Sequence, residues 1–432
     1  MRSFTFKNSS ILCHGGIMRI LSLVYCAALI LTAASSAVLA EGQSSARSVA
    51  MGGAHIGLAS GVDAALFNPA NLGLDNHHQT GLEFIGFGAD ISNNAFSLSD
   101  YNKYTGALLT TDDKAYILGK IPAEGLHLNV DAEATAMAFS SGPFALTMTG
   151  VGQADVNLSR DIFDLILNGN TFADTINVTG SYSDVVSYAS AGISYGIPIY
   201  TQGSRQLAVG VTAKYIRGIG IERVTEMQGM VATYATGYSG NGKVIAQTAT
   251  GGTGMGLDLG AALKLNDKYT LGAKLENFVS SIKWNQKTQE RGYLFSFDTM
   301  TVANMGDSFV TSDDYTRDIG SFSTSLPSTL NAGIARTSGK LLWAVDWQQG
   351  FTNDPGTSTK PRLSLGAEYS LLGFLPLRAG YATGGNRNTA FSFGSGLHLF
   401  ALHIDAAAVT GSSFSGYSSK GLNFAVSTGL YF

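Results

Sequence analysis

The chain has 432 residues, of which 13% are charged and 45% hydrophobic, and it carries a formal net charge of −4. This weakly acidic balance argues against a nucleic-acid-binding protein. The only two cysteines, Cys13 and Cys26, precede residue 41, so the rest of the chain is not a disulfide scaffold. Low charge and 53 glycines, without a later apolar run as long as a membrane helix, are typical of a β-barrel that faces lipid.

The first forty residues have the features of a secretory signal peptide. Only three charged residues, all basic, precede Glu41, and an apolar core over residues 20–32 is followed by small residues. We therefore predict a signal peptide over residues 1–40, with Glu41 as the first residue of the mature chain. Met18 is an alternative start. A retained anchor is the other interpretation, but the apolar core is short for a membrane span.

Residues 41–78 lack the alternation that marks the later part of the chain. They are rich in glycine and alanine and contain a Met-Gly-Gly-Ala run from Met51 and an Asn-Pro-Ala run from Asn68. Glycine allows two backbones to approach closely. We therefore expect a compact segment that could fit inside a barrel.

Alternating apolar and polar residues recur from about residue 79 to the C-terminus, which is the pattern of strands with one face toward lipid. The number of predicted strands is even, as expected for a bacterial outer-membrane barrel. The fourteen predicted strands lie near residues 79–97, 126–140, 144–158, 183–199, 206–217, 252–265, 269–284, 326–337, 341–350, 361–370, 375–383, 389–399, 401–410 and 421–432.

Short and long connections alternate between these strands. Gly, Asn, Asp and Ser mark the short ones as hairpin turns. Short periplasmic turns and long extracellular loops are the outer-membrane pattern, so we predict a Gram-negative outer-membrane protein with both termini in the periplasm. Helix signals over 111–120 and 160–167 predict short helices in two extracellular loops. The long connections lie near residues 98–125, 159–181, 218–250, 285–325, 351–360, 384–388 and 411–419.

The two faces of the predicted strands differ in chemistry. Apolar residues such as Leu207, Val209, Leu363 and Leu365 fall on one face, which we assign to lipid. The other face carries charges of both signs, which we interpret as a paired network that fills and stiffens the lumen; a charged ion pathway is the alternative. The predicted network comprises Lys214, Asp258, Lys264, Lys274, Glu276, Arg362, Glu368, Arg378 and Asp405, and Asp346, His398 and His403 share this face.

The last strand, Gly421 to Phe432, ends the chain on an aromatic residue. Leu422, Phe424 and Val426 share its apolar face. Such a strand suits a barrel in which the last strand pairs with the first and presents apolar side chains to lipid.

The stretch from Ala46 to Leu74 resembles the N-terminal signature of the FadL superfamily of outer-membrane proteins. The resemblance rests on the Met-Gly-Gly-Ala run and on Asn68, Pro69 and Ala70. This superfamily includes fatty-acid and toluene-type channels, as well as PorV-like secretion components and TraF-like proteins. The resemblance implies a fourteen-stranded barrel over residues 79–432, plugged by an N-terminal hatch over residues 41–78.

In the fatty-acid channels of this superfamily, ligands leave sideways through a kink in the third strand. The third predicted strand here contains Gly150 and Gly152, which are therefore a possible lateral-opening kink. Ordinary strand glycines are the alternative.

Two functions follow from these features. The first is a passive channel for small hydrophobic compounds, either fatty acids or aromatic hydrocarbons; the alternative is a PorV-like secretion-accessory or structural barrel with a protein partner. A continuous apolar cavity would favour the channel, and a polar cavity would favour the interaction barrel. We predict outer-membrane lipid as a partner, no nucleic acid, no cofactor, no metal site and no catalytic residues. His398, His403 and Asp405 are the strongest metal candidate, but hydrogen bonding in the lumen explains them better.

Overall fold

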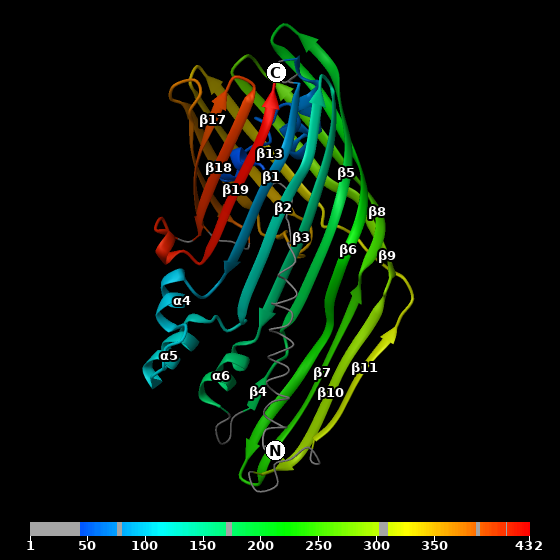
Figure 1. Cartoon of the computed structure of the whole chain (residues 1–432), viewed down its shortest axis with the longest axis vertical. Helices are drawn as coiled ribbons and strands as arrows, with labels where there is room; N and C mark the ends of the chain where they lie inside the picture. The colour runs from blue at the N-terminus through cyan, green and yellow to red at the C-terminus, as the bar shows by residue number, and fades with distance from the viewer. Residues whose placement is uncertain (1–43, 76–79, 170–174, 302–309, 386–388, 412) are drawn as a thin grey trace, which may run out of the picture.

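The computed structural model describes residues 44–75, 80–169, 175–301, 310–385, 389–411 and 413–432 (Figure 1). The predicted signal peptide, with Met18 and Glu41, lies outside this part of the chain.

Fourteen strands of the described chain close into one antiparallel barrel. Consecutive barrel strands are neighbours, and β19 pairs with β1 from Gly81↔Tyr431 to Ser92↔Gly421. The predicted fold class is therefore confirmed. The barrel strands are β1 (Gly81–Asn93), β2 (Leu126–Ser141), β3 (Phe144–Leu158), β5 (Tyr182–Gln202), β6 (Arg205–Tyr234), β8 (Gly251–Lys264), β9 (Tyr269–Gln286), β13 (Thr329–Ser338), β14 (Leu341–Gly350), β15 (Arg362–Ser370), β16 (Pro376–Gly384), β17 (Ala390–Leu399), β18 (Leu402–Gly411) and β19 (Gly421–Tyr431).

The outer surface of the barrel carries the apolar face predicted from the alternation. Leu207, Val209, Leu363 and Leu365 are all exposed, whereas alternate residues such as Asp258 are buried inside. This arrangement places apolar side chains against lipid and charges in the lumen. Among the described residues, no helix has the length and apolar character needed to cross a membrane.

The two ends of the barrel differ in their connections, as predicted. Tight turns lie at the end near the C-terminus, at the top of Figure 1, which we call the short-turn end. The opposite, long-loop end carries α4 (Leu98–Tyr104), α5 (Thr111–Lys120), α6 (Arg160–Asn168) and the 3₁₀ turn η4 (Gly416–Ser418). The side chains of Thr110 and Asp113 form a capping box that explains where α5 begins.

A four-stranded arm extends beyond the barrel at the long-loop end (Figure 1). The second half of β6 pairs with β7 (Gly237–Ala249), followed by β10 (Gln289–Met300) and β11 (Val310–Asp318). Short strands β4 (Thr175–Asn177) and β12 (Phe322–Thr324) pair with β6 and β9.

The arm was not expected from the sequence, which predicted only long connections over 218–250 and 285–325. Its alternating aromatic residues were the missed signal, because Phe295 and Phe297 stack on one face of β10. Their rings cover Gly242 and Gly240 of the neighbouring strand, so the aromatic residues provide the packing that the glycines lack.

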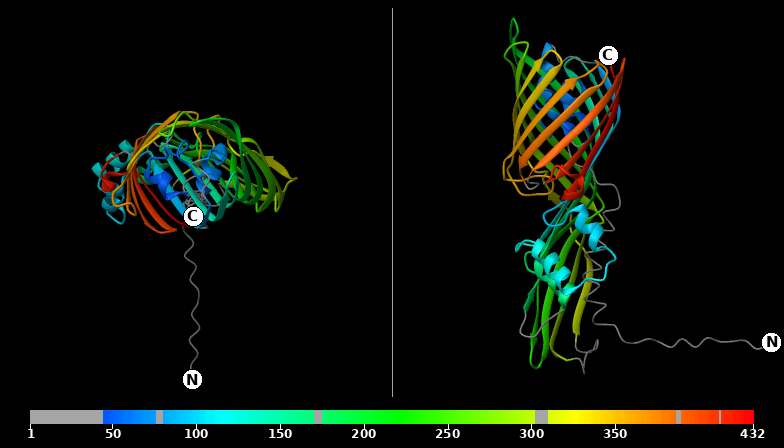
Figure 2. Two further views of the ribbon diagram at one scale, coloured as in Figure 1. Left: turned by 90° about the horizontal axis from the view of Figure 1, so that it is seen from above. Right: turned by 90° about the vertical axis from the view of Figure 1, so that its left-hand side faces the viewer.

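Residues 44–75, the first described part of the chain, lie inside the barrel (Figure 2). They include α2 (Ala46–Ala50), α3 (Val62–Phe67) and the 3₁₀ helix η1 (Pro69–Gly73), which are largely buried. Helix α2 contacts β16 to β19, α3 contacts β1 to β3, and η1 contacts β5, β6, β8 and β9. We call described residues 44–75 the hatch, because they cross the lumen from wall to wall.

A charged substitution on β15 tests whether the outer face of the barrel contacts lipid. Leu365→Arg places a charge on this face near the middle of the strand. We expect a loss of about 2–4 kcal/mol in the free energy of unfolding in lipid vesicles, the range for Arg near the midplane. Urea titration followed by the gel shift of the folded barrel measures it. Leu372→Arg, on an exposed turn, is the matched control; equal losses in both variants would contradict this assignment of the outer face.

Candidate functional site

The Asn-Pro-Ala motif holds one side of the hatch against bare backbone of the barrel wall. The Asn68 side chain donates a hydrogen bond to Ala261 O at 3.0 Å, and its oxygen accepts one from Ala70 N at 3.2 Å. A Cβ atom on Gly210 would lie 2.3 Å from Ala70 N, and one on Gly260 would lie 2.3 Å from Asn68 Oδ1. Glycine is therefore required on the wall strands opposite the motif.

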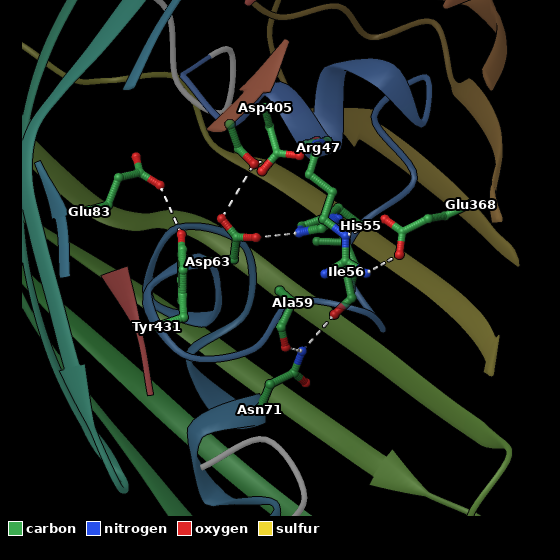
Figure 3. Close-up of polar contacts among 12 residues, drawn as sticks. Arg47, His55, Ile56, Ala59, Asp63, Asn71, Glu83, Glu368, Asp405 and Tyr431 are labelled. Carbon is green, nitrogen blue, oxygen red and sulfur yellow. Dashed lines mark hydrogen bonds and ion pairs between the residues drawn. The ribbon is translucent and has the colours of Figure 1, made fainter. Parts of the chain in front are cut away.

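An ion-pair chain ties the other side of the hatch to the wall, and Figure 3 shows its first two members, Arg47 and Glu368. Arg47 on α2 contacts both carboxylate oxygens of Glu368, at 2.9 and 3.1 Å. Glu368 also pairs with Arg378 at 2.6 Å, and Arg378 donates to Asp405. His398 continues the chain to Asp405 at 3.2 Å. Bidentate, charge-assisted contacts of this kind fix orientation as well as position.

A second wall carboxylate holds the middle of the hatch. Asp346 on β14 accepts hydrogen bonds from the backbone N–H groups of His55 and Ile56, at 2.5 and 2.8 Å. Within the hatch, His55 contacts Asp63 at 3.0 Å. Burial raises the pKa of Asp63, but the hydrogen bond to His55 and the charges of His55 and Arg47 bring it below its usual value. Asp63 is therefore held as a carboxylate.

The remaining predicted network residues divide into separate groups. Lys214 and Lys274 flank Asp258 at 3.0 and 3.3 Å, and Lys274 also contacts Glu276 at 2.7 Å and the hatch carbonyl of Leu66 at 2.8 Å. Two other members lie apart from these ion pairs. Lys264 pairs with the exposed turn residue Asp267 at 3.2 Å, and Arg362 lines a cavity. The role of these groups in stiffening the barrel stays a prediction.

That cavity lies between the hatch and the long-loop end and has a volume of about 290 Å³. Hatch residues including Ile56 and Phe67 form part of its lining. Most of its other lining residues are polar, and they come from β1 to β3, β5, β9, β13 to β15, β17 to β19 and the loop after β14. The cavity is therefore not the continuous apolar space expected for a channel of purely hydrophobic compounds.

An apolar cluster adjoins this cavity inside the barrel. We call it the lumen cluster. Its member Tyr188 also lines the cavity. Together these side chains form a buried apolar cluster beside the cavity. The lumen cluster comprises Val151, Tyr188, Ile216, Ile221, Ala249, Ile282, Trp284 and Leu326.

The barrel wall is irregular beside the lumen cluster. In the described chain, the backbone ladder of β9 with β12 ends at Ile282 and resumes with β13 at Glu276. Across this interval Ser280 Oγ accepts from Leu326 N at 2.9 Å and donates to Leu326 O at 3.0 Å. The pairing of β9 with β8 also shifts here. We call residues 277–281 and 325–328 the wall interruption.

Gly150 and Gly152, the predicted lateral-opening kink, lie on β3 and are not part of the wall interruption. Through both glycines, β3 pairs with β2 and with β5 without a break in the described residues. The nearest irregularity in its pairing with β2 lies between Thr135 and Met137. A lateral opening at these glycines stays a prediction, and the ladder would have to part to make one.

The histidines near the short-turn end form a stack. The rings of His398 and His403 lie 3.8 Å apart and parallel, and Tyr431 stacks on His403 at 4.8 Å. No group of potential metal ligands was found among the described residues.

The chain is similar to known proteins both in sequence family and in fold. Residues 69–406 match a family described as "Family of unknown function (DUF5723)". No curated protein sequence matches the chain. Solved structures do match the fold. The toluene transporter TbuX of Ralstonia pickettii matches with a TM-score of 0.52 at 15% identity, over 90% of this chain and 99% of that one.

Two further solved structures agree. The P. putida toluene transporter TodX matches with a TM-score of 0.51 at 15% identity, over 90% of this chain and 98% of that one. A FadL homologue of Pseudomonas aeruginosa matches with a TM-score of 0.50 at 13% identity, over 92% and 99%. At such identities the similarity establishes a common fold. The resemblance suggested by Ala46–Leu74 is thus confirmed for the architecture.

Substitution of Gly210 tests whether the Asn-Pro-Ala motif holds the hatch closed. Gly210→Leu should displace the Asn-Pro-Ala turn, because its Cβ would overlap the backbone of Ala70. We expect a folded barrel whose single-channel conductance in planar bilayers is severalfold above that of the parent protein. Gly119→Ala is the control, since a Cβ there meets no atom within 4 Å. Unchanged conductance in a folded Gly210→Leu barrel would show that the motif does not hold the hatch closed.

Proposed function

The chain belongs to the DUF5723 family, whose function is unknown, and we propose that it is a passive outer-membrane channel for small hydrophobic compounds of the fatty-acid or aromatic-hydrocarbon type. The proposal is supported by a fold shared with proteins described as toluene transporters. In this arrangement the short-turn end and both termini face the periplasm, and the arm and helices face the outside.

The lumen cluster is the observation that carries the proposal. Its member Tyr188 lines the polar cavity, and its member Leu326 is also part of the wall interruption. The cluster therefore lies between the cavity and the wall interruption. An apolar molecule that leaves the polar cavity gains favourable contacts with these side chains.

The hatch makes a sideways route necessary. It contacts strands around the barrel and is tied to them by Asn68, Arg47 and the two N–H groups that meet Asp346. A straight path to the short-turn end would require these contacts to break. In the proposed route, a compound moves from the cavity across the lumen cluster and out through the wall interruption into lipid.

The outer face of the wall interruption suits release into lipid. Phe278 and Val279 are 52% and 61% exposed there. Two side chains, Ser280 and Asn277, replace part of the backbone ladder. Side-chain hydrogen bonds of this kind can exchange by rotamer changes, whereas a continuous ladder must lose several backbone bonds together.

An interaction barrel is the second candidate, and the polar cavity lining and the projecting arm favour it. A stable protein partner would then bind the arm formed by β6, β7, β10 and β11. Crosslinking in native membranes tests this candidate. Recovery of a defined partner whose binding requires the arm, together with unchanged uptake after gene deletion, would support it over the channel.

A disulfide across the wall interruption tests whether compounds leave the barrel there. The double variant Ser280→Cys/Leu326→Cys should form a disulfide across the wall interruption, because the Ser280 hydroxyl lies within 3.0 Å of the Leu326 backbone. The native cysteines precede Glu41, so no other pairing competes once the predicted signal peptide is removed. We expect oxidation to reduce uptake of a labelled fatty acid or aromatic hydrocarbon at least fivefold in a deletion strain, and reduction to restore it.

A matched disulfide distinguishes the two possible exits. Thr149 and Ser190 are opposed residues of β3 and β5 whose hydroxyl oxygens lie 2.8 Å apart, next to Gly150. Thr149→Cys/Ser190→Cys should leave uptake unchanged in both redox states. Loss of uptake in this variant alone would move the exit to Gly150 and Gly152, and no loss in either oxidised variant would contradict a sideways route.

A further inference from the structure

The charged groups that line the cavity between the hatch and the long-loop end balance one another in number. Apart from His127, four acidic and four basic side chains line it. A charged ligand would therefore meet no excess of the opposite charge there. The eight charged residues are Asp90, Asp131, Glu276, Asp346, Lys274, Lys360, Arg362 and Lys420.

Most of these charged side chains are engaged by contacts of their own. Lys274 contacts Glu276 at 2.7 Å. Lys420 donates a hydrogen bond to Asn94 O at 2.9 Å, and Asp346 accepts two from hatch N–H groups. A charged ligand would have to compete with these contacts. The other lining residues that have partners are Asp90, Asp131 and Arg362.

Three uncharged side chains, by contrast, are buried beside the cavity without a hydrogen-bond partner among the described residues. They are Ser364 on β15, Ser392 on β17 and Gln153 on β3, and they are 6%, 1% and 8% exposed. A buried polar group left without a partner costs about 1–3 kcal/mol. Each of the three can both donate and accept a hydrogen bond, so each matches a ligand hydroxyl group, which does the same.

The Met-Gly-Gly-Ala run of the hatch leaves one of these hydroxyl groups open to the cavity. Gly53 lines the cavity, and a Cβ atom there would lie 3.5 Å from Ser364 Oγ. Its φ of +91° also disfavours any residue with a side chain. The glycine therefore keeps the hatch surface clear next to Ser364.

The other two uncharged groups lie at the ends of one rung of paired residues in the barrel wall. The rung crosses six neighbouring strands, from β17 through β19 and β1 to β3, and every member lines the cavity. A ligand with several hydroxyl groups can therefore bond to more than one strand. In order, the members are Ser392, Val409, Asn423, Asp90, Asp131 and Gln153.

Apolar surface borders these groups. Ile56 and Phe67 of the hatch line the cavity, as does Tyr188 of β5. Val151, two residues from Gln153 on the same face of β3, is the direct partner of Tyr188. The C–H face of a sugar ring or a short alkyl chain can lie on such side chains. The volume of about 290 Å³ is near the lower end for small-molecule sites and suits a group of monosaccharide size.

We propose that the cavity binds the uncharged, hydroxyl-rich end of an amphiphile, such as the sugar ring of an alkyl glycoside. Ser364, Ser392 and Gln153 bond to its hydroxyl groups, and its apolar end lies toward the lumen cluster. The inference rests on the proposed channel function, and it narrows the transported compounds from hydrophobic molecules in general to neutral amphiphiles.

Calorimetry with matched probes tests this binding. The barrel in nanodiscs of zwitterionic lipid is titrated with hexyl β-glucoside, hexanol, hexylamine, hexanoate and toluene, and the heat from empty nanodiscs is subtracted. The first four probes share one alkyl chain and differ only in the polar end. We expect saturable binding of hexyl β-glucoside that is at least tenfold tighter than that of hexanol, hexylamine or hexanoate.

Removal of the buried hydroxyl groups tests their role. Ser364→Ala and Ser392→Ala should each weaken binding of hexyl β-glucoside about 2- to 10-fold, and the double variant about 5- to 100-fold, as expected for neutral hydrogen bonds. Binding of toluene should stay within about twofold. Gln153→Leu, which keeps the side chain long, should act in the same direction. Ser204→Ala, in an exposed turn, is the control and should change nothing.

The outcomes separate this inference from the channel function. Binding of hexylamine or hexanoate as tight as that of hexyl β-glucoside would overturn the inference, and so would a preference for the glucoside that the double variant retains. Saturable binding of toluene without tighter binding of the glucoside than of hexanol would overturn it while supporting a channel for apolar compounds. Absence of saturable binding by all five probes would overturn both.

Discussion

The pairing of β1 with β19 is the interaction on which the rest of this structure depends. A sheet that crosses a membrane cannot leave an open edge, because each unpaired backbone group in hydrocarbon costs several kcal/mol. Here the first and last strands pair from Gly81↔Tyr431 to Ser92↔Gly421 and close the cylinder. Closure then divides every strand into a lipid face and a lumen face, and it places the charged residues inside.

A lumen of this kind must be filled, and the hatch fills it with paired polar contacts. Buried charges are costly unless they are paired and hydrogen-bonded. Arg47 meets Glu368, and Lys274 meets Asp258, Glu276 and a hatch carbonyl. Since these contacts join the hatch to the wall, the polar interior holds the hatch in place. In the proposed channel, a compound would therefore need a path around the hatch.

Much of the architecture was predictable from alternation alone. The fourteen barrel strands, the buried charges and the helix at Thr111–Lys120 follow from local pattern and capping. The arm was missed because its glycine-rich strands, such as the one with Gly240 and Gly242, have weak alternation and depend on aromatic residues from another strand. The sequence left open whether the cavity is polar or apolar, because residues from many strands meet there only after closure.

The sequence by itself determined the barrel, the face of each strand and the compact hatch, because each of these depends on residues that are near neighbours in the chain. Only the tertiary structure decided that Asp90 lies opposite Asp131 and that Gly356, from the loop after β14, lies beside Gln153 and Asp131. It also decided that the wall is interrupted beside Leu326, where β9 meets the chain between β12 and β13. These features depend on register and on contacts between segments far apart in sequence, which no local pattern specifies.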